Sequence, residues 1–377
     1  MISAQGTDLV VVGGGLIGLS IALAAARGGR QVRLLEAEHV GRHASSASAG
    51  GVRSLNRHPA EIALVRAALP LWVGLAGDLG ADVGFSSSGQ MRVAEDEAAL
   101  AALKARAALT RDLGFSHEVL QDRAGLFARE PQIAAHCLGA LSVTDDGFAD
   151  PLATVRAYRG AALRAGVDIR QGVAVRAIMP GITLDTTAGE MQAGAVVNAA
   201  GAWGAQLAAM VGETAPVEAR GLQMSVTAPL PPFMNGVIGS EGRKLSLKQM
   251  GNGTVVIGGA YQGRVEDVAR VARPVQARVA ANVATAARLF PPLAQARIVR
   301  SWAGLEGWSA DGLPVIGPSG TVPGLIHAFG FCGHGFALVP LVGPLVAQML
   351  DGRMPSQSLT GFGISRFHEK MKDIQHA

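Results

Sequence analysis

Three glycines close to the start of the chain mark the first place where the sequence predicts chemistry. Gly13, Gly15 and Gly18 form a G-x-G-x-x-G pattern directly after a β-branched run, Asp8–Val12. Gly13 permits a tight turn, Gly15 lets the backbone approach a pyrophosphate, and Gly18 allows close helix–strand packing. Glu36 follows, where a carboxylate can accept hydrogen bonds from both ribose hydroxyls. This pattern predicts a dinucleotide site, and Glu36 disfavours NADP, whose extra phosphate it would repel.

The elements around these residues must position them. The pattern predicts a buried strand over 8–12, an Ala- and Leu-rich helix over 16–27 that ends at Gly28-Gly29, and a second strand over 31–35. Together they form a βαβ unit, for which a right-handed crossover is expected. Phosphates would lie on the helix N-terminus, where free N–H groups point at them. A glycine-rich turn without a ligand is the alternative.

Length and composition indicate a large globular protein. The chain has 377 residues, of which 49% are hydrophobic and 16% charged. Because one compact core stops growing at about 250–300 residues, we expect two closely joined domains. The net charge is +4 and the isoelectric point about 9.4, but Lys and Arg occur singly, without aromatic interleaving. Nucleic acid is therefore not an expected partner.

Cysteine usage and hydropathy bear on location. Only Cys137 and Cys332 are present, far apart, so the sequence predicts no metal site, no iron–sulfur cluster and a reducing cytoplasmic setting. The apolar stretch 9–26 contains four glycines, and no basic residue precedes it. It is expected to be strand, turn and helix rather than a signal or transmembrane segment.

Further along, the pattern alternates between two kinds of structure. Helices are expected over 60–79, where Pro70 should kink or break the helix, over 98–113, and over 150–165 after an Asp150 N-cap. Strands over 167–176 and 194–198 should return to a parallel sheet, and the strand–turn–helix pattern resumes from Gly324. Between residues 217 and 261 the hydrophobic period becomes two, which predicts antiparallel sheet.

The predicted fold class is therefore α/β, with a Rossmann-type cofactor domain interleaved with a mainly antiparallel α+β substrate domain. The cofactor domain is assigned to residues 1–85, 145–215 and 300–377. The substrate domain is assigned to residues 86–144 and 216–299.

Four motifs carry a resemblance to a known family. They are VVNAAGAW over 196–203, RSWAGL over 300–305, DGLPVIGP over 311–318 and GFCGHGF over 330–336. With the N-terminal βαβ unit they resemble the D-amino-acid oxidase family of flavoproteins, of the two-dinucleotide-fold type. That family includes glycine oxidase, sarcosine oxidase and the flavin subunits of heteromeric opine and D-hydroxyproline dehydrogenases. The pattern resembles the last group most.

The resemblance implies an FAD site. Its residues would be Gly13, Gly15, Leu16, Ile17, Gly18 and Glu36 for pyrophosphate and ribose, Ser45, Ser46, Ala49, Gly50 and Gly51 for the ring and ribityl chain, Val175 for adenine, Ala200, Gly201 and Trp203 beside the phosphates, and Gly330, Gly333, His334, Gly335 and Phe336 in the loop before the last helix. The N-terminus of that helix would face the N1–C2=O edge of the flavin.

The resemblance also implies how the flavin is held. Relatives that attach flavin through cysteine carry it near Gly304, where this chain has none, so the FAD should be non-covalent. For His334 we favour ordering of the loop over proton transfer. A small packed residue is the expected role of Cys332.

The implied reaction is oxidation of a Cα–N bond to an imine that water hydrolyses. The cofactor performs the difficult step, so no catalytic triad or carboxylate pair is needed. The substrate would be an amino acid or an N-substituted amino acid. A stand-alone oxidase that uses dioxygen is one alternative, and a non-catalytic dinucleotide-binding subunit is an alternative of another class.

Four residues are predicted to act on the substrate or the acceptor. Arg53 is the first candidate for the substrate carboxylate and Arg57 the second, although either could be an ordinary surface arginine. Glu306 stands where glycine-oxidase-like relatives carry an arginine, which favours a cationic or secondary amine, unless Glu306 pairs with Arg300. Lys248 falls where some oxidases hold a lysine that promotes reaction with dioxygen.

The same pattern favours a role as one subunit of a dehydrogenase. This chain has no cysteines for an electron relay, so an iron–sulfur partner subunit would supply it, with a second flavin- or nucleotide-binding subunit as a further possible partner.

Overall fold

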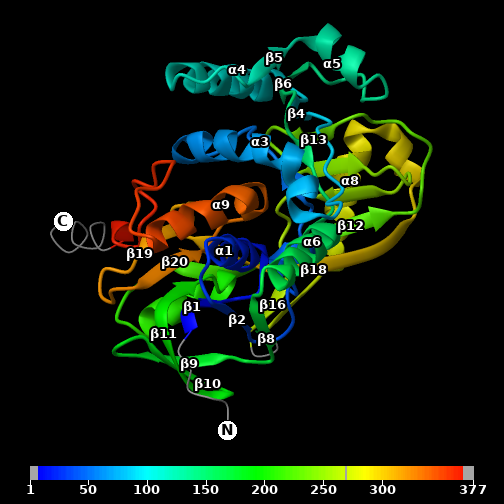
Figure 1. Ribbon diagram of the computed structural model, residues 1–377. Coiled ribbons are helices and arrows are strands. Elements are labelled where there is room, and N and C mark those ends of the chain that lie inside the picture. The colour runs from blue at the N-terminus through cyan, green and yellow to red at the C-terminus, as the bar shows by residue number, and fades with distance from the viewer. Residues whose placement is uncertain (1–6, 268–269, 368–377) are drawn as a thin grey trace, which may run out of the picture.

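The computed structural model describes residues 7–267 and 270–367 (Figure 1). The outer ends of the predicted cofactor segments, 1–6 and 368–377, lie outside the described residues. β1 (Thr7–Val12), α1 (Leu16–Arg27) and β2 (Val32–Glu36) form the predicted βαβ unit, within one residue of the expected bounds. Leu9, Val10 and Val11 are fully buried, as expected for a central strand with both faces covered.

The first sheet contains this unit at its centre. Its order is β19 (Val315–Pro318), β20 (Leu325–Phe329), β11 (Gly189–Asn198), β1, β2 and β8 (Asp168–Gln171). The neighbours from β20 to β8 are parallel, and β19 is antiparallel to β20. The parallel return of residues 194–198 is confirmed.

The predicted single strand over 167–176 is wrong. Gly172 has a φ of 74°, and the chain turns there into β9 (Val175–Met179). β9 then pairs antiparallel with β10 (Thr183–Thr186), which pairs with β11.

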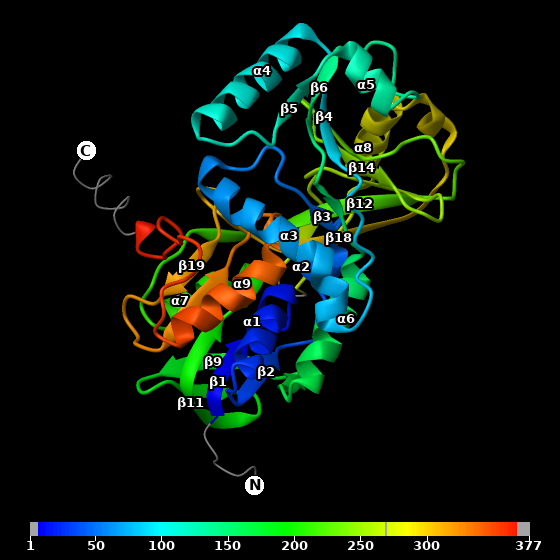
Figure 2. The same ribbon diagram turned by 45° about the horizontal axis from the view of Figure 1, so that its top comes forward.

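A layer of packed helices covers one face of this sheet (Figure 2). α1 packs against α9 (Gly335–Leu350) and α6 (Pro151–Arg164), and α3 (Ile62–Leu79) packs on α9. Asp150 caps α6 as predicted, since its side chain accepts a hydrogen bond from the Ala153 N–H at 2.9 Å. Pro70 does not break α3, which runs continuously past it.

The second sheet is mainly antiparallel. Its order is β18 (Ile298–Ser309), β12 (Val217–Thr227), β15 (Val255–Gly258), β14 (Ser246–Gln249), β13 (Val237–Ser240), β4 (Gln90–Ala94), β6 (Gly139–Val143) and β5 (Val119–Gln121). β13 and β4 form its parallel pair. The helices α4 (Glu97–Asp112), α5 (Arg123–Arg129) and α8 (Gln276–Leu289) complete this part of the molecule.

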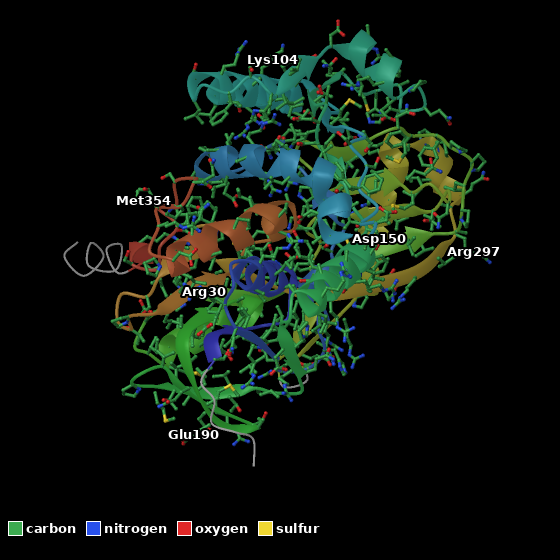
Figure 3. The ribbon with its side chains drawn as sticks, viewed as in Figure 1. Arg30, Lys104, Asp150, Glu190, Arg297 and Met354 are labelled. Carbon is green, nitrogen blue, oxygen red and sulfur yellow. The ribbon has the colours of Figure 1, made fainter. Side chains whose placement is uncertain are left out.

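β18 joins the two parts of the protein. It pairs with β12 from Ile298 to Ser309, so this segment lies in the second sheet although the sequence division placed most of it with the cofactor segments. Figure 3 shows Lys104 on α4 at one end of the molecule and Glu190 on β11 at the other. The antiparallel domain therefore sits over one end of the first sheet (Figure 1).

Within the described residues, one helix is long and apolar enough to cross a membrane. It spans Pro59–Leu79, which joins a short 3-10 turn to α3. Trp72 in this helix is fully buried and donates its indole N–H to the Ala337 carbonyl oxygen of α9 at 2.8 Å. These contacts are those of a core helix, and length and composition alone are weak evidence for a span.

Candidate active site

A cavity of about 470 Å³ lies where the carboxyl ends of β1, β2 and β11 meet β18 and the start of α9. In parallel sheets ligands bind at this edge of the strands. The predicted cofactor residues that line the cavity are Gly13, Gly15, Leu16, Ile17, Glu36, Ser45, Val175, Ala200, Gly201, Trp203, Gly333, Gly335 and Phe336. Segments from four distant parts of the sequence therefore converge on one cavity.

The first glycine turn is shaped for close backbone contact. Gly13 has a φ of 113°, and a Cβ placed there would lie 2.3 Å from the Ala199 carbonyl oxygen. A Cβ at Gly15 would meet only the Ser45 hydroxyl, at 3.1 Å, and Gly15 lines the cavity. The structure thus keeps the space in front of Gly15 free for a ligand, which fits a dinucleotide pyrophosphate.

The Glu36 carboxylate is held in place by the backbone. Its two oxygens accept hydrogen bonds from the Gly14 N–H at 2.7 Å and the Glu38 N–H at 2.8 Å. Since a carboxylate can accept about four hydrogen bonds, lone pairs remain for ribose hydroxyls on the cavity side. Glu36 is oriented before any ligand arrives.

The short helix α2 (Ala44–Ala47) supports the middle of the cavity. The Ser45 hydroxyl accepts a hydrogen bond from the Leu16 N–H at 2.9 Å, at the start of α1. Trp302 donates its indole N–H to the Ala47 carbonyl oxygen at 2.9 Å, and a Cβ at Gly304 would lie 2.4 Å from that of Ala47. β18 therefore packs directly on the segment predicted to pass the flavin.

Several predicted cofactor residues lie behind the cavity wall and do not line it. They are Gly18, Ser46, Ala49, Gly50, Gly51, Gly330 and His334. Gly18 has the expected packing role, since a Cβ there would lie 1.9 Å from the Gly13 carbonyl oxygen. Gly50 has a φ of 66° and shapes the turn into β3 (Gly51–Val52), close to the Ala149 carbonyl oxygen. For these residues direct contact with the cofactor stays a prediction.

Glu306 is a buried acid on the wall of the cavity. Its side chain lines the cavity, the residue is only 9% exposed, and a Cβ at Gly333 would lie 3.0 Å from its Oε2. Within the part of the chain that the structure describes, Oε2 has no hydrogen-bond partner. Burial raises the pKa of Glu306 to about 7. A buried, unpartnered carboxyl facing a cavity is typical of a group that meets a ligand.

Arginines near Glu306 do not neutralise it. Its cross-strand neighbour Arg220 pairs with Glu218 and stacks over Trp308, with 4.9 Å between the guanidinium and the ring centre. Arg300, the alternative partner, forms no ion pair with Glu306 among the described residues.

His334, in the loop before α9, contacts Glu61 of the 3-10 turn that precedes α3. Its Nδ1 lies 3.0 Å from Glu61 Oε2, and burial lowers the pKa of His334 to about 4, with the nearby charge of Arg57 acting in the same direction. A neutral His334 at the N-cap of α9 fits the ordering role that we favoured.

Arg53 and Arg57 lie beside this pair, but neither lines the cavity. Arg53 donates from Nη1 to the Leu55 carbonyl oxygen at 2.7 Å. Arg57 is 3% exposed, and its Nη1 has no hydrogen-bond partner in the described structure. Burial, followed by the charge of Arg53, lowers the pKa of Arg57 to about 9. The second candidate thus has the free donor that a substrate carboxylate needs.

Lys248 reaches the segment next to α2 from the second sheet. Its ammonium donates to the Ala49 carbonyl oxygen at 2.5 Å and lies 4.0 Å from the ring centre of Phe148. Burial lowers the pKa of Lys248 to about 7, against the opposing charge of Asp150. The predicted position beside the flavin segment is compatible with these contacts, although Lys248 does not line the cavity.

Sequence reasoning missed several cavity residues. Arg42, His43, Ser48 and Arg270 line the cavity, as does Cys332, which was expected only to pack. Arg42 and His43 precede the predicted Ser/Ala/Gly turn, so their proximity could have suggested them. Arg270 lies far from every motif, and no pattern in the sequence points to it.

We expect FAD to be released intact when the protein is precipitated with acid. Cys332 is the cysteine on the cavity wall, and burial raises its pKa, which makes the thiol a poor nucleophile. The supernatant should contain FAD by chromatography. Flavin that stays on the precipitated chain would contradict non-covalent binding, and a C332S variant would then identify the attachment.

Comparison with known proteins agrees with this geometry. Glycine oxidase of Geobacillus kaustophilus (strain HTA426) is 32% identical over 95% of this chain and 97% of its own length. An opine oxidase subunit of Rhizobium meliloti is 28% identical over 96% of this chain and 97% of its own length. The crystal structure of glycine oxidase from Geobacillus kaustophilus superposes with a TM-score of 0.86 at 27% identity, covering 96% of this chain and 99% of that one.

The fold recurs in L-proline dehydrogenase from P. horikoshii, with a TM-score of 0.89 at 23% identity over 98% of this chain and 99% of that one. A family model described as "FAD dependent oxidoreductase" matches residues 8–349. The chain therefore belongs to the FAD-dependent oxidoreductase family of D-amino-acid oxidase type.

Proposed function

We propose that this protein oxidises the C–N bond of an amino acid or an N-substituted amino acid. The observation that carries the proposal is the one cavity that is lined both by the Gly13–Gly15 turn and by the unpartnered Glu306. Relatives named as glycine oxidase and as subunits of opine oxidase and sarcosine oxidase support the same class of donor.

Bound FAD would supply the two-electron acceptor for a hydride that leaves the substrate Cα, and the resulting imine would be hydrolysed by water. The protein's task would be to orient the substrate and to exclude water from the reacting carbon. Glu306 would meet the nitrogen or a cationic side chain. The arginines Arg53 and Arg57 would attract the carboxylate, and His334 would order the loop at the start of α9.

Anaerobic bleaching of the flavin spectrum tests the proposal. The purified protein is mixed with a panel of D-, N-methyl and opine-type amino acids, and absorbance near the flavin maximum is followed. Loss of the yellow colour with a subset of the panel is the expected result. A protein that binds FAD but is reduced by no member of the panel would indicate a non-catalytic dinucleotide-binding subunit instead.

The physiological electron acceptor is proposed to be a partner subunit. The relatives named as subunits of opine and sarcosine oxidases support a hetero-oligomer, in which an iron–sulfur or second flavin- or nucleotide-binding subunit would accept the electrons. Cys137 and Cys332 of this chain are free thiols, which persist in a reducing compartment, so we propose a cytoplasmic location. The rival is a single-chain oxidase, for which the purified chain alone would form peroxide at a rate matching substrate oxidation.

Replacing Lys248 with methionine distinguishes these two acceptors. If dioxygen is the acceptor, K248M should slow reoxidation of the reduced flavin about 10-fold or more, because a buried cation near the ring stabilises developing negative charge. Flavin reduction by substrate should change little. Stopped-flow measurement of the two half-reactions checks this, with K244M as an exposed control on the same segment. Equal reoxidation in wild type and K248M would contradict a role for Lys248 with dioxygen.

A further inference from the structure

The hairpin of β16 (Arg264–Glu266) and β17 (Val271–Arg273) packs against the long β12–β18 pair. A Cβ at Gly221 of β12 would lie 2.8 Å from the Ala272 Cβ, and one at Gly263 would lie 2.4 Å from the Arg273 carbonyl oxygen. Such close packing at the base leaves little room for the hairpin to shift. The strand β17, which begins directly after Arg270, is therefore packed closely against β12.

Arg270 directly precedes β17 and lines the cofactor cavity. It has a φ of 49°, and its N–H donates to the Asp267 carbonyl oxygen at 3.1 Å. Its guanidinium lies 5.4 Å from the ring centre of Trp203, whose ring centre is 4.6 Å from that of His43. A residue of the hairpin thus reaches the wall of the cavity that also contains the Gly13–Gly15 turn.

Within the described residues, no carboxylate balances the charge of Arg270. Arg264 and Arg273, on the same hairpin, both pair with Glu266, and the cavity residue Arg42 pairs with Glu38 at 2.6 Å. Among residues 7–267 and 270–367 no carboxylate lies within ion-pair distance of Arg270. A cation on a cavity wall without a counter-charge indicates an anionic ligand.

Trp203 locates this cation relative to the glycine turn. It ends the 3-10 turn η2 (Gly201–Trp203), and a Cβ at Gly13 would lie 3.0 Å from Ala200 Cα, immediately before that turn. Arg270 therefore lines, beside Trp203, the same cavity as the N-terminus of α1, where phosphates are expected to bind. The neighbouring His43 adds little charge there. Burial lowers its pKa, Glu38 opposes this, and the charges of Arg42 and Arg270 lower it further.

We infer that Arg270 binds the pyrophosphate of FAD together with the N-terminus of α1 and slows release of the cofactor. The pyrophosphate would then contact both the helix N-terminus and a guanidinium supplied by the hairpin. Cofactor retention would depend on both of these segments, and this inference does not depend on which substrate is oxidised.

The test measures release of FAD from wild type, R270A and R264A after dilution, by the recovery of flavin fluorescence. R264A removes an exposed, ion-paired arginine of the same hairpin and serves as the matched control. Alanine at position 270 adopts the same left-handed backbone at a cost similar to that of arginine. Loss of a charged hydrogen bond predicts release on the order of 10- to 100-fold faster in R270A. R270K should lie between, and the difference should shrink in high salt.

Competition binding to the apoprotein identifies the group that Arg270 holds. ADP carries the pyrophosphate and adenosine does not, so R270A should weaken ADP and leave adenosine unchanged. Three outcomes would overturn the inference. One is wild-type release of FAD by R270A, another is an equal loss of adenosine affinity, and the third is equally fast release by R264A, which would indicate a general effect of the hairpin.

Discussion

Replacing Gly15 with valine is expected to lower the affinity for FAD by at least about 100-fold, in a protein that still folds. The two γ-methyl groups would occupy the space in front of the turn, where Gly15 lines the cavity. Overpacking costs about 1–3 kcal/mol, and lost phosphate hydrogen bonds add to it, which together reach two powers of ten. Titration of apoprotein with FAD, followed by fluorescence quenching, measures the change.

Retention of the fold follows from the surroundings of Gly15. A Cβ at this position meets only the Ser45 hydroxyl, whereas Gly13 and Gly18 are enclosed by backbone atoms. Far-UV circular dichroism and the thermal midpoint of the apoprotein should therefore match wild type in G15V. G15A should weaken FAD binding to a smaller extent. A fully yellow G15V protein would show that the pyrophosphate lies elsewhere.

Local patterns predicted the cofactor unit well, because its signals lie within a few residues of each other. Helix α1 begins directly after Gly15 and ends directly before Gly28, as the sequence predicts, and the Asp150 cap of α6 is confirmed. Short strands such as β5 were missed, since three residues carry little periodicity. The turn at Gly172 required a positive φ that no hydrophobic pattern reports.

The candidate site was predictable only where a family motif covers it. Glu306 was named from its motif, and the structure adds that the carboxyl is buried and unpartnered. The choice between Arg53 and Arg57 depends on which guanidinium has a free donor, which is a property of tertiary contacts. Arg270 belongs to no motif, and only folding of the hairpin brings it to the cavity.

The second large effect is a loss of kcat/KM when the residues proposed to bind the substrate carboxylate or nitrogen are replaced. Losing a buried, charged hydrogen bond costs about 2–5 kcal/mol, so R53A should lower kcat/KM by about 30-fold or more. R57A should have at least as large an effect if the free Nη1 of Arg57 binds the carboxylate. Steady-state kinetics on both variants, with FAD content as the measure of folding, separates the two arginines.

Glu306→Gln keeps the shape of the side chain and removes its charge. It should keep the FAD content unchanged and lower kcat/KM for cationic substrates by about 30-fold, while neutral side chains are affected less. Because the pKa of Glu306 is about 7, wild-type affinity for a cation should increase as pH rises through 7, and E306Q should lack this step. An unchanged ranking of substrates in E306Q would contradict the recognition role.

The thermal stability of E306Q distinguishes a recognition role for Glu306 from an ion pair between Glu306 and Arg300. A carboxyl whose folded pKa is raised from 4.5 to about 7 binds more protons in the folded state, so the free energy of unfolding falls as pH rises between these values. E306Q lacks this loss, and without substrate it should unfold at a higher temperature than wild type above pH 7. An ion pair with Arg300 would have the opposite sign, since E306Q would then lower the thermal midpoint at high pH. A carboxyl that lowers the stability of the ligand-free fold above pH 7, yet raises affinity for a cation, is a recognition group.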